Sequence, residues 1–221
     1  MRLTLFDLDH TLLDGDSDVL WCEFLMQHGL LKRSTFTPRN QAMASGYQAG
    51  SVSTQDFCSF YVGLLAGRSP LQWQPLCQQF LRDCVIPRLP AAALALVQRH
   101  QAAGDCVVLS TATNRVITEL TAAHLGIQHL IATECEVSSA GVLTGKVSGT
   151  ANMREGKVAR LLAWLAERGT TLEGCDSRFY SDSINDLPLL TAVKHAVVVN
   201  ADVRLAHIAQ QRGWPALSLR L

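Results

Sequence analysis

Two aspartates near the start of the chain are the first residues that could carry chemistry. Asp7 and Asp9 follow the largely apolar run 3–6, and an extended chain would direct both carboxylates to one side. Two anions this close repel each other unless a cation lies between them, and Mg²⁺ prefers carboxylate and water oxygens. One aspartate could also attack phosphorus and form an acyl phosphate while the other donates and recovers a proton. Taken alone, the pair fits a solvated turn equally well.

Polar residues also follow two later stretches that have the pattern of buried strands. Ser110 and Thr111 lie at the end of one, and Asp182, Asn185 and Asp186 follow the other. Ligands of parallel sheets bind beyond the carboxyl ends of the strands, where a hydroxyl can donate to a phosphoryl oxygen. The alternatives are a turn-forming serine and a helix start whose acids complement the helix dipole. Together with Asp7 and Asp9, these residues indicate a metal and phosphate site.

Two further sets of charged residues are candidates for the same site. Lys157, close to the start of a predicted helix, could neutralise a phosphate group or a nucleophile, although a lone lysine there is usually on the surface. Asp14, Asp16 and Asp18 form a turn and the N-cap of the next helix, and they could also face a substrate.

The residue pattern predicts an α/β fold, a doubly wound parallel sheet (Rossmann-like core) with an inserted helical cap domain. Residues 15–84 read as the cap, and residues 1–14 and 85–221 as the catalytic core. The cap helices are expected at 17–27, 37–49, 53–67 and 69–84, each with Ser, Thr, Pro or Gly signals at its ends. The later core strands are expected at 105–110, 130–133, 178–181 and 195–199, with a hairpin within 134–148. The core of the cap is expected to contain Trp21, Phe24, Phe57, Phe60, Tyr61 and Trp73.

Composition narrows the class of protein. The 221 residues are 48% hydrophobic and 17% charged, with a formal net charge of zero, which suits a globular protein with a sizeable core. No basic run indicates a nucleic-acid or membrane partner, and no apolar stretch approaches the roughly 20 residues of a membrane span. The seven cysteines include no C-x-x-C pair and predict buried, reduced thiols in a cytoplasmic protein without a signal peptide. The oligomeric state stays open.

Several common motifs are absent from the sequence or incomplete. An EF-hand starting at Asp14 would place Val19 and Leu25 where Gly and Glu are required. Gly145-Lys146 resembles the end of a phosphate-binding loop, but Val147 replaces the Ser or Thr and the first Gly is missing. Neither G-x-G-x-x-G nor G-x-S-x-G occurs, so no dinucleotide site or serine hydrolase elbow is expected.

The order and spacing of these residues resemble those of the haloacid dehalogenase superfamily, in the group with a helical cap after the first strand. The matching elements span almost the whole chain and are Asp7-Leu8-Asp9-His10-Thr11-Leu12, Ser110, Lys157 and Asp182-Ser183-Ile184-Asn185-Asp186. The phosphoserine phosphatase branch is the broader match. Gly15-Asp16-Ser17-Asp18 and the stretch 180–190 are more similar to a bacterial subgroup that includes histidinol-phosphatases.

This resemblance implies a role for each matching residue. Asp7 would be the nucleophile, and Asp9 the general acid and then the base. Magnesium would be held by the Asp7 side chain, the Asp9 backbone carbonyl and the Asp182 side chain, with Asp186 supporting them. The phosphoryl group would be held by Ser110 and Lys157, with Thr111, Asn185 and Asp16 as further substrate contacts.

The sequence therefore predicts a Mg²⁺-dependent phosphatase for a small amino-acid-related phosphate ester, with histidinol phosphate preferred and phosphoserine second. Phosphoserine phosphatases hold the substrate carboxylate with a cap arginine, but the corresponding stretch 57–65 has no Arg or Lys, and Arg68 lies just beyond it. A phosphotransferase or phosphomutase would use the same residues. A phospho-accepting signalling domain remains the non-enzymatic alternative, although the acid Asp9 and the cap disfavour it. A dehalogenase would need neither magnesium nor the second aspartate.

Overall fold

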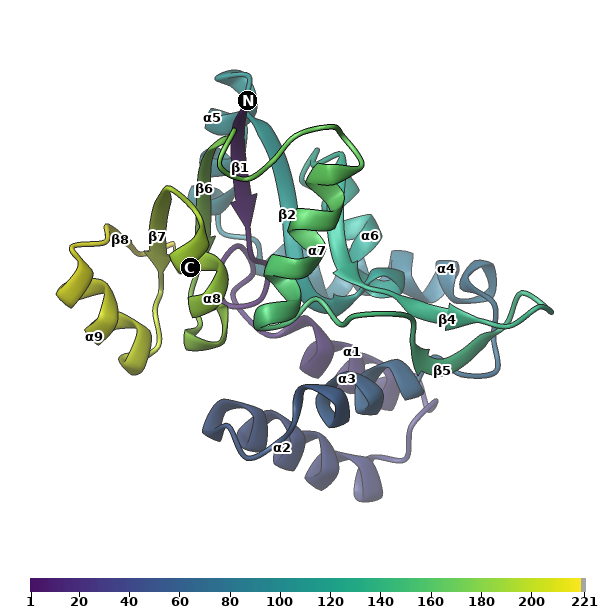
Figure 1. Cartoon of the computed structure of the whole chain (residues 1–221). Coiled ribbons are helices and arrows are strands. Elements are labelled where there is room, and N and C mark those ends of the chain that lie inside the picture. The colour runs from purple at the N-terminus through teal and green to yellow at the C-terminus, as the bar shows by residue number, and fades with distance from the viewer. Residues whose placement is uncertain (220–221) are drawn as a thin grey trace.

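The core of the protein is a six-stranded parallel sheet, in a computed structural model that describes residues 1–219, the side chain of Gln48 excepted (Figure 1). The strand order is β3-β2-β1-β6-β7-β8, so the first strand lies in the middle of the sheet. The strands are β1 (Arg2–Phe6), β2 (Cys106–Asn114), β3 (His129–Thr133), β6 (Asp176–Ser181), β7 (His195–Val199) and β8 (Ala216–Leu217). The predicted doubly wound α/β sheet is confirmed; β8 was not predicted.

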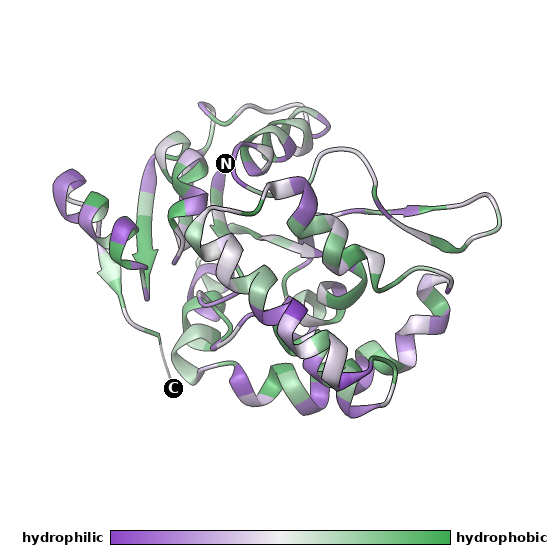
Figure 2. Ribbon diagram, turned by 90° about the horizontal axis from the view of Figure 1, so that it is seen from below, coloured by the Kyte–Doolittle hydropathy of each residue, from purple (hydrophilic) through white to green (hydrophobic). Residues whose placement is uncertain are grey.

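Helices cover both faces of this sheet because its strands are apolar on both sides. Phe6 and Leu109 face a cluster that includes α5 (Ala91–Ala102) and α6 (Arg115–His124). Leu3 and Leu5 face the opposite cluster, which includes α7 (Glu155–Ala166), α8 (Leu187–Ala192) and α9 (Val203–Arg212). Figure 2 shows hydrophilic and hydrophobic residues alternating along these helices, as expected for elements between a core and water. No helix within residues 1–219 is long and apolar enough to cross a membrane.

A helical insertion after β1 lies beyond the carboxyl ends of the strands (Figure 1). It comprises α1 (Ser17–Gln27), α2 (Arg33–Ala49), α3 (Thr54–Gly63) and α4 (Pro70–Phe80), followed by a π-helical turn and a 3₁₀ turn over 81–88. This confirms the predicted cap, while the division at 14/15 and 84/85 stays a prediction. The start of α2 at residue 37 was wrong. The helix begins at Arg33, and Pro38 lies inside its second turn, where the missing amide costs one hydrogen bond.

The aromatic residues of the insertion divide between two cores. Phe57 and Tyr61 pack with Phe36 in a separate cap cluster, as predicted. Trp21, Phe24 and Trp73 instead join the large cluster on the α5 side of the sheet, so α1 and α4 are anchored to the catalytic core. We therefore distinguish the outer cap helices, α2 and α3, from two inner helices fixed to the sheet.

A β-hairpin provides a second attachment for the cap. Strands β4 (Cys135–Val137) and β5 (Leu143–Val147) form the antiparallel pair predicted within 134–148. Leu143 donates to the backbone carbonyl of Arg68 at 2.9 Å and accepts from Gly67 at 3.0 Å. Gly145 has φ +83°, and a Cβ there would lie 2.9 Å from that of Ala66. The glycine of the incomplete phosphate-loop motif thus permits close packing between the hairpin and the cap.

Candidate active site

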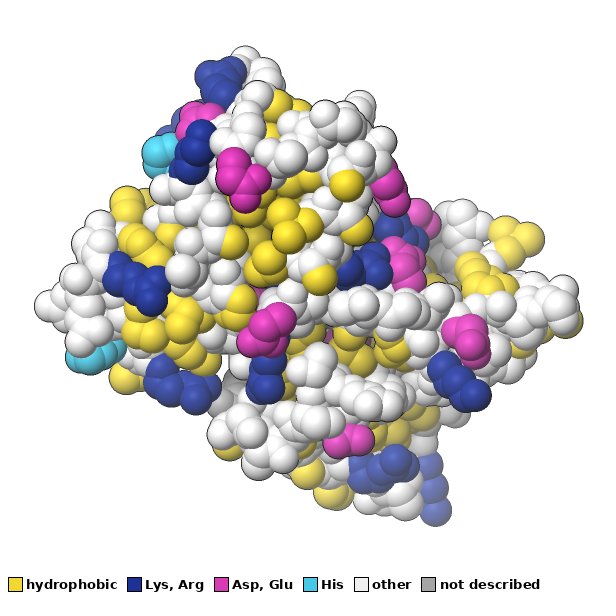
Figure 3. Space-filling view, in the orientation of Figure 1, with side chains coloured by type: hydrophobic (Ala, Val, Ile, Leu, Met, Phe, Trp, Pro, Cys, Tyr) yellow, Lys and Arg dark blue, Asp and Glu magenta, His cyan; other side chains and the backbone are white. Residues whose placement is uncertain are grey.

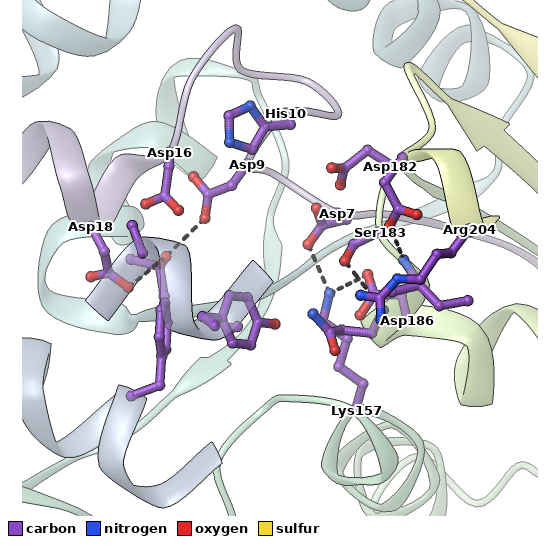
Figure 4. A pocket seen from close by; sticks show the side chains of 18 of the residues that line it. Asp7, Asp9, His10, Asp16, Asp18, Lys157, Asp182, Ser183, Asp186 and Arg204 are labelled. Carbon is purple, nitrogen blue, oxygen red and sulfur yellow. Dashed lines mark hydrogen bonds and ion pairs between the residues drawn. The ribbon is translucent and has the colours of Figure 1, made fainter. Parts of the chain in front are cut away.

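A cavity of about 440 Å³ lies where the carboxyl ends of the strands meet the cap (Figure 4). Aspartates dominate its lining: Asp7, Asp9, Asp16, Asp18, Asp182, Asp186 and Asp202. Its basic lining residues are Lys157 and Arg204, together with His10. Because Asp7 follows β1 and Asp182 follows β6, adjacent parallel strands bring residues 175 positions apart to one edge. The structure therefore places together the four acids Asp7, Asp9, Asp182 and Asp186, as the sequence predicts.

Lys157 is the cation at the centre of this acidic site. Its side chain is 2% exposed, and Nζ lies 2.7 Å from Asp7 Oδ1 and 2.6 Å from Asp186 Oδ2. Burial opposes its charged form, but Asp186 and Asp7 outweigh burial and raise the pKa of Lys157. The lysine comes from the first turn of α7, which packs on the face opposite α5. It is therefore a fixed ammonium beside the candidate nucleophile and not a surface lysine.

Thr11 connects Asp7 to Asp182. Its hydroxyl lies 3.2 Å from Asp7 Oδ2 and 3.2 Å from Asp182 Oδ1, and it accepts from the Asp182 amide at 3.0 Å. One hydroxyl has one hydrogen, so it cannot satisfy both carboxylates at once. Burial is the main cause that raises the pKa of Asp7 to about 7, against the opposing charge of Lys157, and it also raises the pKa of Asp182 well above its usual value. The negative charge of Asp186 adds to both shifts, and that of Asp7 adds to the shift of Asp182.

This donor set suits a divalent cation. Mg²⁺ commonly binds one or two protein carboxylates and completes its shell with water and phosphate oxygens. Asp7 and Asp182 supply such a pair, and the excess of acids over bases leaves negative charge to be compensated. Asp186 is engaged by Lys157 and by the Ser181 hydroxyl at 2.8 Å, which suits a supporting position. Within residues 1–219, no three acid, His or Cys side chains form a ready-made metal cage.

Asp9 points away from this pair, toward the start of the cap (Figure 4). Its Oδ1 accepts from the Ser17 amide at 2.7 Å, and its Oδ2 accepts from the Thr113 hydroxyl at 2.9 Å. Burial, with the nearby charge of Asp16, raises the pKa of Asp9 to about 6. A carboxyl group that titrates near neutrality suits a proton donor and acceptor. The Asp9 side chain is directed away from Asp7 and Asp182, and the predicted metal contact of its backbone carbonyl stays a prediction.

The three aspartates at the cap hinge occupy different positions. Asp14 is exposed and does not line the cavity. Asp16 caps α1 by accepting from the Val19 amide at 3.0 Å, and burial raises its pKa. Asp18 is buried; one carboxylate oxygen lies 3.2 Å from the Thr113 hydroxyl, and Oδ1 has no partner among the described residues. Burial and the charges of Asp16 and Asp9 raise the pKa of Asp18 well above its usual value.

Ser110 and Thr111, predicted to contact the substrate, are fully buried and do not line the cavity. Ser110 Oγ accepts from Asn152 Nδ2 at 3.1 Å, and Thr111 Oγ1 accepts from the Thr113 amide at 3.2 Å. The expected strand ended at Ser110, but β2 continues to Asn114 with a register shift over 110–114. Thr113 therefore lines the cavity instead. The phosphoryl contacts of Ser110 and Thr111 stay predictions.

Of the two remaining candidate contacts, one lines the cavity and the other does not. Asn185 lines the cavity and accepts from Arg154 Nε at 3.2 Å. Arg68 does not line the cavity; its guanidinium lies 4.7 Å from the centre of the Trp73 ring. Sequence reasoning missed Tyr47 and Phe57, which line the cavity with ring centroids 4.2 Å apart. The sequence analysis assigned Phe57 to the core of the cap alone. An aromatic residue can belong to a core and line a cavity at once, and its position in the sequence does not show this.

Comparisons with known proteins show which proteins this chain resembles. The sequence profile of the haloacid dehalogenase-like hydrolases matches residues 4–191. The chain is 38% identical over 220 residues to a histidinol-phosphatase of Neisseria meningitidis, covering 99% of each. It is 31% identical to phosphoserine phosphatase SerB1 of Mycobacterium tuberculosis, covering 98% of this chain and 70% of that protein. A crystal structure of a Bordetella pertussis protein of unknown function has a TM-score of 0.93 at 43% identity, covering 99% of this chain and 98% of that one.

The positioning role of Thr113 leads to the first prediction. Thr113→Val removes the hydroxyl that holds Asp9 and should lower kcat about 10- to 100-fold, the usual value of a hydrogen bond to a charged group. KM should change little because Thr113 is expected to act through Asp9. Thr113→Ser keeps the hydroxyl and should retain most of the activity. Equal losses in the Val and Ser variants would show that the threonine methyl group matters and not its hydroxyl.

The raised carboxyl pKa values lead to the second prediction. Asp7 and Asp9 have folded-state pKa values of about 7 and about 6, against 3.8 in the unfolded chain. Between pH 3.8 and these values the folded protein therefore binds more protons than the unfolded chain does. Stability of the metal-free protein should therefore fall as pH rises from 5 to 8, by roughly 5 °C or more in Tm. Mg²⁺ should restore more stability at pH 8 than at pH 5, because protons compete for Asp7.

Differential scanning fluorimetry in EDTA and in excess Mg²⁺ measures both effects. Asp182→Asn should remove the response to Mg²⁺, because it takes away one of the two candidate ligands. A Mg²⁺ response of the same size at both pH values, or one that survives in Asp182→Asn, would contradict the assignment of these ligands.

Proposed function

Because this chain belongs to the haloacid dehalogenase-like hydrolase family and is a phosphoric monoester hydrolase, we propose that it acts on a small amino-acid-related phosphate ester, histidinol phosphate in the first place. The observation that carries the proposal is the contact of one buried lysine with Asp7 and Asp186, in a cavity otherwise rich in aspartates. Such a site attracts cations and holds a carboxylate nucleophile in place.

In the proposed reaction, an Asp7 carboxylate oxygen attacks phosphorus and the ester oxygen leaves. Asp9 protonates the leaving oxygen, so the alcohol departs neutral. Asp9, now a carboxylate, removes a proton from water as that water attacks the phosphorus of the aspartyl phosphate. The bond between the Asp7 oxygen and phosphorus breaks, inorganic phosphate leaves, and the Asp7 carboxylate is regenerated. Lys157 and Asp186 keep Asp7 oriented, while Thr113 and the Ser17 amide keep Asp9 oriented.

The proposed cofactor is Mg²⁺, held by Asp7 and Asp182 with Asp186 behind them. When bound it would neutralise charge on the transferring phosphoryl group, which is the main electrostatic task in phosphoryl transfer. The protein side of that task falls to Lys157, whose raised pKa keeps it charged. The contacts predicted for Ser110, Thr111 and Asn185 belong to the same proposal.

The cap side of the cavity supports an amine as the substrate's second group. Asp16 and Asp18 line this side, and Tyr47 and Phe57 present aromatic rings beside them. An ammonium group would meet the carboxylates, and an imidazole ring could pack on the aromatic faces. Histidinol phosphate carries both groups and has no carboxylate.

Phosphoserine is the second candidate, supported by the 31% identical relative of that name. Its carboxylate would face the aspartates at the cap unless it reached Arg204, a basic residue of the opposite wall. The position of Arg68 over Trp73 removes it as a partner in this arrangement.

A phosphotransferase would need a second alcohol in place of water. A signalling domain would need a lasting phospho-aspartate, which a base at Asp9 would shorten.

The mechanism leads to a prediction about trapped intermediates. Asp7→Asn should abolish turnover, because an amide oxygen cannot replace the carboxylate as nucleophile. Asp9→Asn should form the phosphorylated enzyme slowly and then stall, because the base for hydrolysis is missing. Acid quenching and mass spectrometry should locate the phosphate on Asp7. A phosphate on a serine or histidine would refute the mechanism, whatever the substrate.

Substrate preference leads to a separate prediction. We expect kcat/KM for histidinol phosphate to exceed that for phosphoserine at least tenfold, about 1.4 kcal/mol of transition-state stabilisation. Imidazolepropanol phosphate, which lacks only the amine, should lose a similar factor. Phosphoethanolamine, which lacks only the carboxylate of phosphoserine, should be hydrolysed at least as well as phosphoserine. If phosphoserine is preferred and Arg204→Met abolishes the preference, the amine proposal is wrong while the phosphatase proposal stands.

A further inference from the structure

A second charged cavity lies at the amino-terminal ends of the strands, away from the candidate active site. Its volume is about 410 Å³, and its lining includes three arginines, Arg2, Arg99 and Arg178, and two histidines, His100 and His195. Arg2 begins β1 and His195 begins β7, whereas Asp7 and Asp182 follow the other ends of β1 and β6. Figure 3 shows basic, acidic and histidine side chains gathered near this upper end of the sheet.

The two acids of this cavity already have partners. Asp105 lies 3.0 Å from Arg2 Nε and 2.7 Å from His100 Nδ1. Asp176 lies 2.9 Å from His195 Nε2. Arg2 and both histidines are thus paired with the two carboxylates of the cavity. Neither carboxylate forms an ion pair with Arg99 or Arg178.

Arg99 and Arg178 remain without an acidic partner among residues 1–219. Arg178 is half-buried in the middle of β6, and its Nε is buried with no hydrogen-bond acceptor in the described part of the chain. A buried guanidinium N–H without an acceptor is unfavourable, because folding removes its hydrogen bond to water and supplies no other acceptor. Because Arg178 lines the cavity, an oxyanion there would give its guanidinium group an acceptor, and guanidinium groups match phosphate oxygens in geometry.

An adjoining cavity extends the same basic surface. Its volume is about 600 Å³, and it shares Arg99, Arg178 and His195 with the first. It adds the cations Lys194 and Arg212 to the lining, and Asp and Glu are absent from that lining. The unpaired guanidinium of Arg178 therefore lies between two cavities whose combined lining carries more positive than negative charge.

We propose that this surface is a second binding site, specific for a phosphate-class oxyanion and separate from the active site. Arg178 provides a half-buried guanidinium at its centre, Arg99 provides a second guanidinium from the last turn of α5, and Lys194 adds long-range attraction. The ligand is either free phosphate or the phosphate group of a larger metabolite, whose remainder would lie in the adjoining cavity.

Titration of metal-free protein with inorganic phosphate tests the proposal. The buffer contains EDTA, and chloride keeps the ionic strength constant; amide resonances report the site of binding. Shifts are expected at residues 99–105 and 176–180. Arg178→Gln and Arg99→Gln should each weaken phosphate binding about tenfold or more, as loss of a charge-assisted hydrogen bond implies. Arg82→Gln is the matched control, because Arg82 is exposed and lines neither cavity.

The other outcomes decide against the site. Shifts confined to residues 7–11 and 182–186 would place phosphate in the active site and refute a second one. Wild-type affinity in both Arg99→Gln, an exposed position that should fold normally, and Arg178→Gln would refute the assigned donors. Equal binding of citrate and phosphate would refute phosphate specificity. Comparing inorganic phosphate with a phosphate monoester distinguishes the two possible sources of the anion.

Discussion

The concentration of carboxylates around one buried ammonium is the constraint on which the rest of the structure depends. Asp7 and Asp182 follow neighbouring parallel strands, so the sheet itself forces like charges together at one edge. In a buried site this repulsion is weakly screened. Lys157 relieves part of it through contacts of 2.7 and 2.6 Å with two of the acids. The packing of α7 on the sheet is therefore also an electrostatic requirement, because it places the lysine there.

The candidate proton donor connects the chemistry to the cap. Asp9 is held on one side by the amide that begins α1 and on the other by the end of β2. Because α1 shares its hydrophobic cluster with the sheet, its first turn is fixed relative to Asp9. The outer helices α2 and α3 bring Tyr47 and Phe57 to the cavity from a separate cluster. This cluster also contains Cys22 and Met26 of α1, so the aromatic side of the cavity is packed against the helix whose first amide holds Asp9.

The sequence predicted the sheet and the acids Asp7, Asp9, Asp182 and Asp186 from local signals, whereas Lys157 received its role only from the family resemblance. Buried strands read as apolar runs, and the acids after them must meet at one edge. The position of Thr113 could not be predicted, since it depends on β2 continuing past Ser110 with a shifted register against β3. A run of polar residues at a strand end gives no indication of which hydroxyl reaches the cavity. The start of α2 was missed because Pro38 suggested a first turn, whereas the helix begins at Arg33 and continues through Pro38 at the cost of one hydrogen bond.

The two edges of the sheet carry an excess of opposite charge. At the carboxyl edge of the sheet, the surplus is negative and lies beside groups with chemical roles, so a cation and a substrate amine would balance it. At the amino edge, the surplus is positive and Arg178 Nε has no acceptor in the described residues. Strands β1 and β6 run between these edges, and β1 spans about 17 Å at 3.3 Å per residue. Charge at one edge acts only weakly on the other across that distance, so the proposed phosphate-class anion at the amino edge would bind independently of the charges at the active site.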